Sequence, residues 1–357
     1  MVKEIVITAN GSYDVLKVRE RPDPALEPNT VKIAVKACGL NFSELMARQG
    51  LYPGAPPLPC VVGYEVAGVV TEVNADETEF KVGQRVAAMT KFGGHASVVV
   101  ANREMVFLIP DFLSFAEAAS IPVNYLTAYH MLFHVARVRP GDQVLVHMAA
   151  GGVGVAAIQL LKTVENVTVF GTASASKHDF IRNLGCTHPI DYNTKDYKTE
   201  ITEILKDKPQ GKRGLDIILD PLGDFKTSYD MLNPCGHLVI FGAANMVNGS
   251  TRSIFNILKQ YWKIPSFSSM SLMDQNKTVS GVHLGHMFMP VLVQMLRQEM
   301  LDIIELYNQG KLKSIVSKEF TFEQAGEAHK YMEQRKNIGK VILVPTEEDL
   351  TKEAPAQ

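Results

Sequence analysis

The sequence predicts an α/β protein in which a doubly wound parallel sheet of the Rossmann type follows an all-β, barrel-like domain. Three observations lead to this prediction: short strands before residue 122, alternating strands and helices from residue 123, and a glycine-rich turn at 151–154. We therefore expect one domain at 1–122 and a cofactor-binding domain at 123–310. Residues 311–345 are expected to return to the first domain, and the tail 346–357 to be disordered.

The first domain is predicted from short strands that turn residues separate. Thr30–Ala37 alternates polar and apolar residues, as a half-buried strand does, and similar runs occupy 4–9 and 66–73. Four prolines at 53, 56, 57 and 59 exclude a helix or a central strand from one loop.

The second domain is predicted from its strand–turn–helix start. An apolar run, Val144–Met148, is followed by a turn that contains Gly151, Gly152 and Gly154, and then by an apolar helical pattern. Glycine allows the backbone to approach a pyrophosphate, and a helix N-terminus offers N–H groups to it. Ala149 replaces the first glycine of the usual Gly-x-Gly-x-x-Gly motif, so an ordinary tight turn remains the alternative interpretation.

The remaining elements continue the alternation. We expect a helix at 322–332 and a closing strand within 337–345. The further predicted strands are Val167–Gly171, Asp216–Leu219, His237–Phe241 and Val279–His283, and the helices between them include Val155–Glu165 and His178–Leu184.

The second strand of this domain favours NADP over NAD. In an NAD-binding fold a carboxylate that binds the ribose 2′-hydroxyl should end this strand, but Ser174, Ser176 and Lys177 stand there instead. Hydroxyl groups and a cation suit a 2′-phosphate, which a carboxylate would repel. The alternative for Lys177 is a solvated lysine at a helix start.

Composition excludes several classes of protein. With 46% hydrophobic and 21% charged residues and a net charge of -2, the chain has the balance of a soluble protein without attraction to nucleic acid. Its four cysteines are scattered, which argues against disulfides and a structural zinc. No signal sequence and no membrane-spanning run is visible. We expect a cytoplasmic protein, at most peripheral on vesicle or organelle membranes.

The chain resembles the medium-chain dehydrogenase/reductase superfamily. Within it, the chain is most similar to the zinc-free quinone oxidoreductase branch and to the synaptic vesicle membrane protein (vesicle amine transport protein) homologue group. The resemblance implies that the first domain is GroES-like. The segments that carry it are Ala37–Tyr52, Val123–Tyr129, Val144–Gly154, Asn166–His178, Thr187–Tyr192 and Gly339–Pro345.

The resemblance also locates the positions at which zinc enzymes of this superfamily hold their metal. Those positions correspond to Asn41, Tyr64 and Val123, and none can replace a thiolate or an imidazole at a tetrahedral zinc site. We therefore expect no metal. His130 and His134 lie four residues apart in a helical stretch, and we interpret them as structural.

Without zinc, the resemblance implies hydride transfer from NADPH to an electrophilic acceptor. The catalytic candidates in the cleft between the domains are Asn41, Tyr52 and Tyr64, with a packed aromatic ring as the alternative for each tyrosine. The implied cofactor contacts are Thr127, Ala150, Gly151, Gly152, Val153, Gly154, Ser174, Lys177, Tyr192, Gly242, Ala243, His283, Leu284 and Asn337.

Two functions are consistent with these features. The first is an NADPH-dependent reductase of quinones or α,β-unsaturated carbonyls. The alternative is a largely non-catalytic NADPH-binding protein that associates with vesicle membranes through lipid or protein partners. Residues 254–267, with Trp262, could supply an interfacial anchor, or pack over the cleft or in a dimer interface. The resemblance also implies a homodimer, and nothing suggests nucleic-acid binding.

Overall fold

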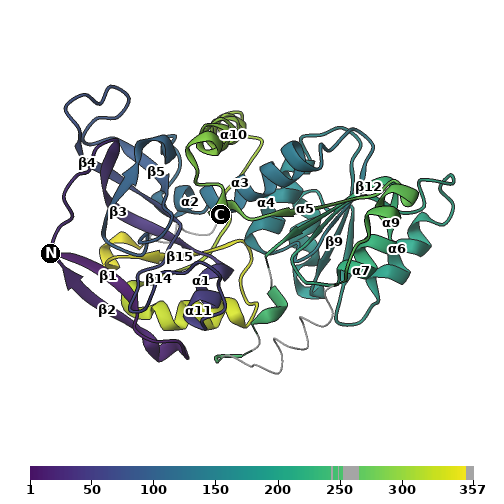
Figure 1. Cartoon of the computed structure of the whole chain (residues 1–357), viewed down its shortest axis with the longest axis horizontal. Coiled ribbons are helices and arrows are strands. Elements are labelled where there is room, and N and C mark those ends of the chain that lie inside the picture. The colour runs from purple at the N-terminus through teal and green to yellow at the C-terminus, as the bar shows by residue number, and fades with distance from the viewer. Residues whose placement is uncertain (243, 248, 252–264, 351–357) are drawn as a thin grey trace. The chain divides into compact units, whose positions relative to one another are not determined.

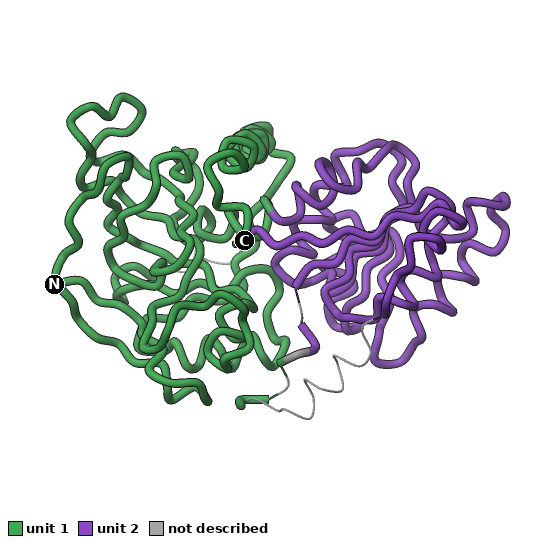
Figure 2. Tube along the Cα trace, viewed as in Figure 1, with its two compact units in different colours: residues 1–126, 247–252, 285–357 green, residues 127–246, 253–284 purple. Residues whose placement is uncertain are grey.

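The computed structural model describes residues 1–242, 244–247, 249–251 and 265–350, which form two compact units (Figure 2). Unit 1 comprises residues 1–126, 247–252 and 285–357, and unit 2 comprises residues 127–246 and 253–284. The chain therefore leaves unit 1 and re-enters it twice. Each unit has its own hydrophobic core and is described by itself.

Unit 1 is built on β-strands. They are β1 (Val2–Ile7), β2 (Leu16–Arg21), β3 (Thr30–Leu40), β4 (Glu65–Val73), β5 (Arg85–Met89), β6 (Val98–Asn102), β7 (Val106–Leu108), β14 (Val316–Thr321) and β15 (Lys340–Val344). The main sheet has the order β14-β15-β3-β4-β5-β7, and β6 also pairs with β3. Only β14 and β15 run parallel, and β1 and β2 form a separate antiparallel pair. This arrangement confirms the predicted β domain.

β3 is the central strand of this sheet and contains the alternating run seen in the sequence. Val31, Ile33 and Val35 are buried in the core of unit 1, which explains the apolar half of the alternation. A side chain at Gly39 would come within 2.3 Å of a Glu65 carboxylate oxygen. The glycine therefore gives the Glu65 side chain of β4 the space it occupies.

The helices of unit 1 flank this sheet. They are α1 (Phe42–Arg48), α2 (Phe115–Ala119), α10 (Pro290–Asn308) and α11 (Ala325–Glu333), and α3 (Pro122–Tyr129) spans the boundary between the units. Single turns are η1 (Tyr13–Val15), η2 (Arg103–Met105), η6 (Leu284–His286), η7 (Phe322–Gln324) and η8 (Glu347–Asp349). Both α1 and α2 begin with a capping box, formed by Asn41 with Glu44 and by Ser114 with Glu117.

Unit 2 is built on a six-stranded parallel sheet (Figure 1). Its strands are β8 (Gln143–Val146), β9 (Thr168–Ala173), β10 (His188–Asp191), β11 (Leu215–Asp220), β12 (Leu232–Phe241) and β13 (Thr278–Val282). The order is β10-β9-β8-β11-β12-β13, and every pair is parallel. Counted along the chain, this is the 3-2-1-4-5-6 order of a Rossmann fold. The predicted doubly wound sheet is confirmed.

Helices cover both faces of this sheet. They are α4 (Gly152–Leu161), α5 (His178–Leu184), α6 (Tyr197–Leu205), α7 (Phe225–Asp230) and α9 (Ser269–Gln275), with a π-helical turn η3 (His130–Val135) and single turns η4 (Ala175–Lys177) and η5 (Ala244–Met246). Phe170 of β9 packs in one core with α6 and α7, whereas a side chain at neighbouring Gly171 would face Ile181 of α5. Successive side chains of a strand point to opposite faces. Helices α5 and α6 therefore lie on opposite sides of the sheet.

Helix α10 groups with unit 1, although the sequence division placed it in the second domain. Arg297 of α10 donates to the carbonyl oxygens of Glu104 and Val106 at 3.0 and 3.1 Å, and its guanidinium lies 5.5 Å from the centre of the Phe107 ring. These contacts join residues about 190 positions apart, so no local pattern indicates them.

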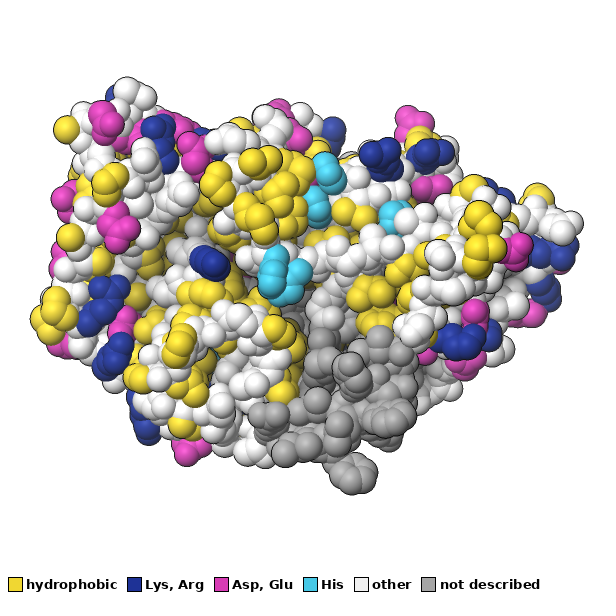
Figure 3. All heavy atoms as spheres, in the orientation of Figure 1, with side chains coloured by type: hydrophobic (Ala, Val, Ile, Leu, Met, Phe, Trp, Pro, Cys, Tyr) yellow, Lys and Arg dark blue, Asp and Glu magenta, His cyan; other side chains and the backbone are white. Residues whose placement is uncertain are grey.

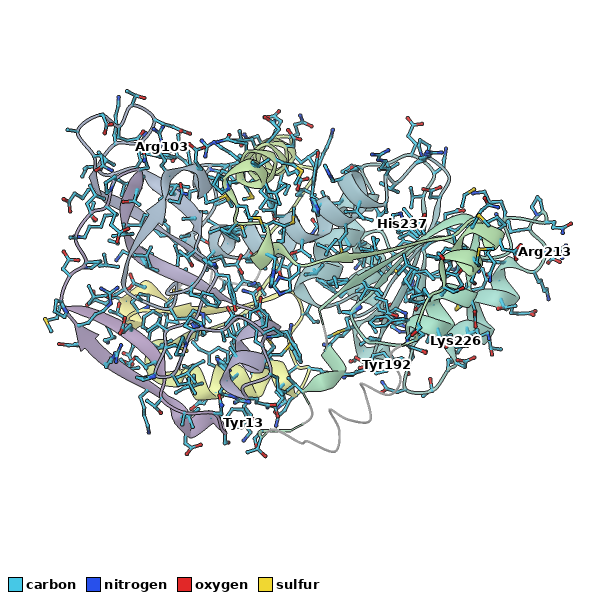
Figure 4. All side chains as sticks on the ribbon, in the orientation of Figure 1. Tyr13, Arg103, Tyr192, Arg213, Lys226 and His237 are labelled. Carbon is cyan, nitrogen blue, oxygen red and sulfur yellow. The ribbon has the colours of Figure 1, made fainter. Side chains whose placement is uncertain are left out.

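Residues 249 and 250 belong to unit 1 because α1 and its C-terminus hold them. Gln49 donates to the Gly249 carbonyl at 2.8 Å, and Arg48 donates to the Ser250 carbonyl at 3.4 Å. The buried Arg48 also pairs with Glu333 and lies over the ring of Tyr13, which is labelled in Figure 4.

The start of the tail is ordered, although we expected disorder from residue 346. Asp349 pairs with Lys36 at 2.7 Å and accepts from the Thr346 hydroxyl, and Leu350 packs against a core cluster of unit 1. The composition of the tail did not reveal this ion pair with β3. Residues 351–357 lie outside the described residues.

Candidate functional site

The glycine-rich turn connects β8 to α4, as predicted. Met148 has a left-handed backbone, with φ of 51°, and its carbonyl accepts from the Gly151 N–H at 2.8 Å. Gly151 is the N-cap of α4 and has no side chain to cap the helix. The first-turn N–H groups of residues 152–154 therefore lack a side-chain cap and suit an anion.

Gly154 is the glycine on which this turn depends. A Cβ atom there would lie 2.4 Å from the Met148 carbonyl oxygen and 2.7 Å from the Ala149 Cα. The helix can approach the turn this closely only without that atom. Ala149, at the first motif position, is buried and accommodates its methyl group. The departure from the glycine motif therefore falls at a position where alanine fits.

The predicted cofactor residues of unit 2 gather at one edge of its sheet. Parallel strands place their carboxyl ends at the same edge, where ligands of open α/β sheets bind. Ala150 and residues 151–154 follow β8, Ser174 and Lys177 follow β9, Tyr192 follows β10, Gly242 follows β12, and His283 and Leu284 follow β13. Tyr192 is exposed at the surface of unit 2 (Figure 4). Thr127 does not follow a strand of this sheet, and its side chain is buried in α3.

No carboxylate ends β9, as the sequence indicated. The strand ends at Ala173, and the Ser174 and Ser176 hydroxyls that follow lie 3.4 Å apart. The carboxylate at the end of the neighbouring β10, Asp191, accepts from the N–H and amide of Asn193 and from the Thr194 hydroxyl. The Asn193 N–H is the main cause that holds the pKa of Asp191 below its usual value. The carboxylate of Asp191 is therefore hydrogen-bonded to residues of the loop that follows β10.

His147, which our sequence analysis did not single out, lies next to the glycine-rich turn. Its side chain is buried, its Nδ1 lies 3.1 Å from the Thr172 hydroxyl, and its Nε2 has no hydrogen-bond partner. The ring meets Tyr197 edge-on at 4.9 Å, and burial lowers its pKa. A neutral imidazole therefore stands at the carboxyl end of β8.

Unit 1 contains a buried charged cluster around Lys340 of β15. Lys340 is 3% exposed, its ammonium contacts the carboxylate of Glu65, and it donates to Asn41 Oδ1 at 2.5 Å and Asn124 Oδ1 at 3.4 Å. The other oxygen of Glu65 accepts from the Val123 N–H at 2.7 Å. Three side-chain oxygens of the chain thus surround an internal cation.

The same cluster engages the whole amide of Asn41, the first catalytic candidate. Its oxygen accepts from Lys340, and its Nδ2 donates to Glu65 Oε1 at 3.1 Å and Glu44 Oε1 at 3.3 Å. An amide has two N–H donors, and both are used. Asn41 therefore has no donor left for an acceptor in this arrangement.

Glu44 is the second carboxyl of the cluster, and burial raises its pKa to about 8, although Lys340 opposes the shift. Its Oε2 accepts from the Asn41 N–H at 2.9 Å and the Ser43 hydroxyl at 3.1 Å. His95 Nε2 lies 3.8 Å from Glu44 Oε1, and burial lowers the pKa of His95 to about 4. At neutral pH the imidazole is therefore uncharged.

Tyr52 and Tyr64, the other catalytic candidates, lie together. Their ring centres are 6.0 Å apart, and Phe92 lies 5.5 Å from Tyr64. Tyr64 is 7% exposed, and its hydroxyl has no hydrogen-bond partner. Burial is the main cause that raises the pKa of both phenols. Both hydroxyls therefore stay protonated at neutral pH and can donate.

The remaining sequence expectations have different outcomes. Asn337 lies in unit 1, where its amide donates to the Gly339 carbonyl at 3.0 Å. Ala243 and most of 254–267 lie outside the described residues. His130 and His134 stack with ring centres 4.9 Å apart in the π-helical turn η3.

A groove of about 510 Å³ lies elsewhere in unit 2. It is lined by residues at the amino ends of β11 and β12, among them Gly214 and Leu232, and by Arg213, which Figure 4 labels. The predicted cofactor residues follow the carboxyl ends of the strands, so this groove is not part of the cofactor edge.

Comparison with known proteins identifies the family. The alcohol dehydrogenase GroES-like domain family matches residues 27–130, and the zinc-binding dehydrogenase family matches residues 184–343. The synaptic vesicle membrane protein VAT-1 homologue of Danio rerio is 45% identical over 344 residues, which cover 96% of this chain and 69% of that protein. The chain belongs to the medium-chain dehydrogenase/reductase superfamily. Within it, the VAT-1 homologues and the quinone oxidoreductase-like proteins are its relatives.

Other members of the superfamily agree with this assignment. The quinone oxidoreductase-like protein 2 homologue of Nematostella vectensis is 30% identical and covers 89% of this chain and 82% of its own length. The crystal structure of the human VAT-1 homolog-like protein is 35% identical, with a TM-score of 0.83 and 99% of both chains covered. Escherichia coli quinone oxidoreductase complexed with NADPH is 26% identical, with a TM-score of 0.81, 96% of this chain and 100% of that chain covered.

Two further observations concern the helices and the surface charge of the chain. Among the described residues, no helix has both the length and the apolar character needed to cross a membrane. On the face drawn in Figure 3, basic and acidic side chains are interspersed over both units. A dispersed pattern of this kind matches the near-neutral charge of the sequence.

Sequence reasoning missed much of the buried cluster of unit 1. Glu44 could have been found, because Asn41 and Glu44 have the spacing of a capping box. Glu65 directly follows Tyr64, one of the three positions that were compared with zinc ligands. No local sequence pattern indicates that Lys340 and His95 belong to this cluster. Lys340 reaches it through the pairing of β15 with β3, and His95 through the fold of the 90–97 loop.

Proposed function

We propose that the chain is a zinc-independent oxidoreductase that transfers a hydride from NADPH to quinones or α,β-unsaturated carbonyl compounds. The observation that carries the proposal is the carboxyl edge of the unit 2 sheet, where an uncapped glycine turn and a β9 end without a carboxylate meet. The glycine turn suits a pyrophosphate, and the end of β9 suits a 2′-phosphate. Escherichia coli quinone oxidoreductase, a structural neighbour, is described as complexed with NADPH.

The donor set of unit 1 supports a reaction without zinc. Two of the three positions that correspond to zinc ligands hold an amide and a phenol, and the third, Val123, has no donor atom in its side chain. Asn41 is engaged by Lys340 and two carboxyls. A thiolate or imidazole is what zinc requires there. The positive charge at this place is the ammonium of Lys340.

The reduced nicotinamide supplies the hydride, and the chain must stabilise the oxygen that becomes negative. Tyr64 fits this role because its buried hydroxyl is a donor without a partner. Tyr52, whose ring lies beside it, is the second donor in the proposal. Asn41 then acts as a positioning residue that holds α1 and the carboxyls in place.

The test is a titration of NADPH and NADH into the purified protein, followed in the same sample by a quinone and an enal. Binding of NADPH in preference to NADH, with oxidation of NADPH when an acceptor is added, is the expected result. Failure to bind either nucleotide would contradict the interpretation of the glycine turn. Binding without turnover would contradict the reductase proposal alone.

A second candidate function is an NADPH-binding protein of vesicle membranes, and the names of the VAT-1 relatives favour it. Flotation with liposomes tests it, with Tyr261→Ala and Trp262→Ala combined in one variant. Lipid binding that the double substitution abolishes would support an anchor in residues 254–267. Protein that stays at the bottom of the gradient would reject the membrane function.

We also propose a homodimer. Strand β13 is an edge strand whose described partner is β12, and it is only partly buried. Edge strands pair readily with another chain. Light scattering after gel filtration should give twice the monomer mass of 39.4 kDa, and a monomer would refute the dimer.

A further inference from the structure

We propose that Glu44 stores the proton that the reduction consumes and passes it to the acceptor site through the hydroxyl of Ser43. The inference rests on the proposed function and assigns a role to a group that the hydride step leaves unused. Reduction of an enone or a quinone needs a hydride and a proton, and the nicotinamide delivers only the hydride.

The first argument is a balance of charge in the buried cluster. Glu44 and Glu65 are both 0% exposed, and the Asn41 amide bridges them, with its Nδ2 atom within 3.3 Å of an oxygen of each. One ammonium, that of Lys340, is in contact with Glu65. Two ionised carboxylates would leave one buried negative charge uncompensated, which is costly in a dry interior. The cluster is neutral when it keeps one proton.

The second argument places this proton on Glu44. Lys340 contacts Glu65 and so favours the ionised form there. His95 lies 3.8 Å from Glu44, but burial lowers its pKa to about 4, so it does not supply a compensating charge at pH 7. Burial raises the pKa of Glu44 to about 8. The other titratable groups that act on this site are Cys38 of β3 and the phenols of Tyr52 and Tyr64.

The third argument is the path. The Ser43 hydroxyl lies 3.1 Å from Glu44 Oε2 and is half-buried, whereas Glu44 is fully enclosed. In the structure Ser43 donates to Glu44, and this hydrogen bond must reverse when Glu44 carries the proton. A hydroxyl can donate and accept, so Ser43 can then take the proton from Glu44 and release its own. Ser43 is therefore the hydroxyl through which a proton on Glu44 can leave the enclosed cluster.

The step balances as follows. The hydride carries two electrons from NADPH to the acceptor, which becomes an enolate or a hydroquinone anion while NADPH becomes NADP⁺. The anion takes a proton from Ser43, a new O–H or C–H bond forms, and Ser43 takes the Glu44 proton. Glu44 is left as a carboxylate, and solvent returns one proton to it before the next turnover.

The first experiment measures the stored proton without cofactor. Infrared difference spectra of the full chain between pH 6 and pH 10 should contain a protonated carboxyl band that titrates near pH 8. The band should vanish in Glu44→Gln and persist in Glu117→Gln, the matched substitution in the capping box of α2. In Glu65→Gln, Lys340 is free to favour ionised Glu44, so the midpoint should fall. A band that survives in Glu44→Gln would overturn the assignment.

The second experiment measures delivery of the proton. Glu44→Gln keeps the capping box, since glutamine also serves at that position, so the variant should fold. It should lower kcat with a quinone or an enal by about 10-fold or more, as loss of a general acid does. The KM for NADPH should not change, and the decline of the wild-type rate above about pH 8 should disappear. Glu117→Gln should behave as wild type.

The outcomes separate this inference from the proposed function. Wild-type turnover with an unchanged rate and pH profile in Glu44→Gln would overturn proton delivery and leave the reductase intact. Absence of wild-type turnover would overturn both, and the infrared band would then identify Glu44 as a buried structural acid.

Discussion

Replacement of Lys340 by methionine should destabilise unit 1, because it removes the cation that balances buried Glu65. Methionine fills a similar volume, but Glu65, at 0% exposure, then keeps its carboxylate without the ammonium. Removal of one partner of a buried ion pair typically costs about 3–5 kcal/mol. The hydrogen bonds from Lys340 to the Asn41 and Asn124 amides are lost as well. We therefore expect a loss at the upper end of that range.

Urea unfolding followed by circular dichroism at pH 7 measures this loss. Lys336→Met, at an exposed lysine four residues earlier, is the control and should change the free energy of unfolding by less than about 0.5 kcal/mol. The double variant Lys340→Met with Glu65→Gln should recover most of the stability, since both charges are then absent. A single variant as stable as the control, or a double variant worse than the single, would refute the reasoning.

Three further predictions concern the candidate site. Tyr64→Phe removes a hydroxyl without a partner, so the free energy of unfolding of the variant should stay within about 1 kcal/mol of wild type. Its kcat with a quinone should nevertheless fall by about 100-fold. An unchanged kcat would remove Tyr64 from the proposal. Gly154→Ala should abolish NADPH binding in a fluorescence titration, because its Cβ would collide with the Met148 carbonyl, whereas Gly281→Ala, with nothing within 4 Å, should bind normally. Lys177→Ala should weaken binding of NADPH about 10-fold more than that of NADH, and an equal loss for both would argue against a 2′-phosphate contact.

Five of the six strands of unit 2 were predictable, because each contains a short apolar run between turn residues. β10 was missed, because its residues His188–Asp191 include a proline and only one aliphatic side chain. The predicted strand at 237–241 nevertheless begins at 232 in the structure, since β12 contains an irregularity where Cys235 has φ of 66°. Pro234 and Gly236 usually interrupt a strand, so the sequence does not indicate that β12 begins at Leu232. Helix α5, by contrast, has the predicted bounds, because a glycine follows it directly.

The candidate site was predictable only where its residues are neighbours in the chain. The glycine turn and the end of β9 are local motifs, and their interpretation needed no tertiary contact. The engagement of Asn41 was not predictable, because its amide is held by Lys340, nearly 300 positions away. Sequence reasoning treated an isolated polar residue as a free donor, whereas burial requires each polar atom to find a partner.

The position of β15 has a consequence for the order in which the chain folds. β15 adds to β3, and it carries Lys340 to the interior carboxylate of Glu65. During synthesis, strands β1 to β7 leave the ribosome long before residue 340 is made. At that stage the N-terminal sheet lacks strand β15 beside β3, and Glu65 lacks the ammonium of Lys340. Contacts between distant residues slow folding. We expect the first 126 residues to remain incompletely folded until the last strand has been made, and unit 2 to fold first.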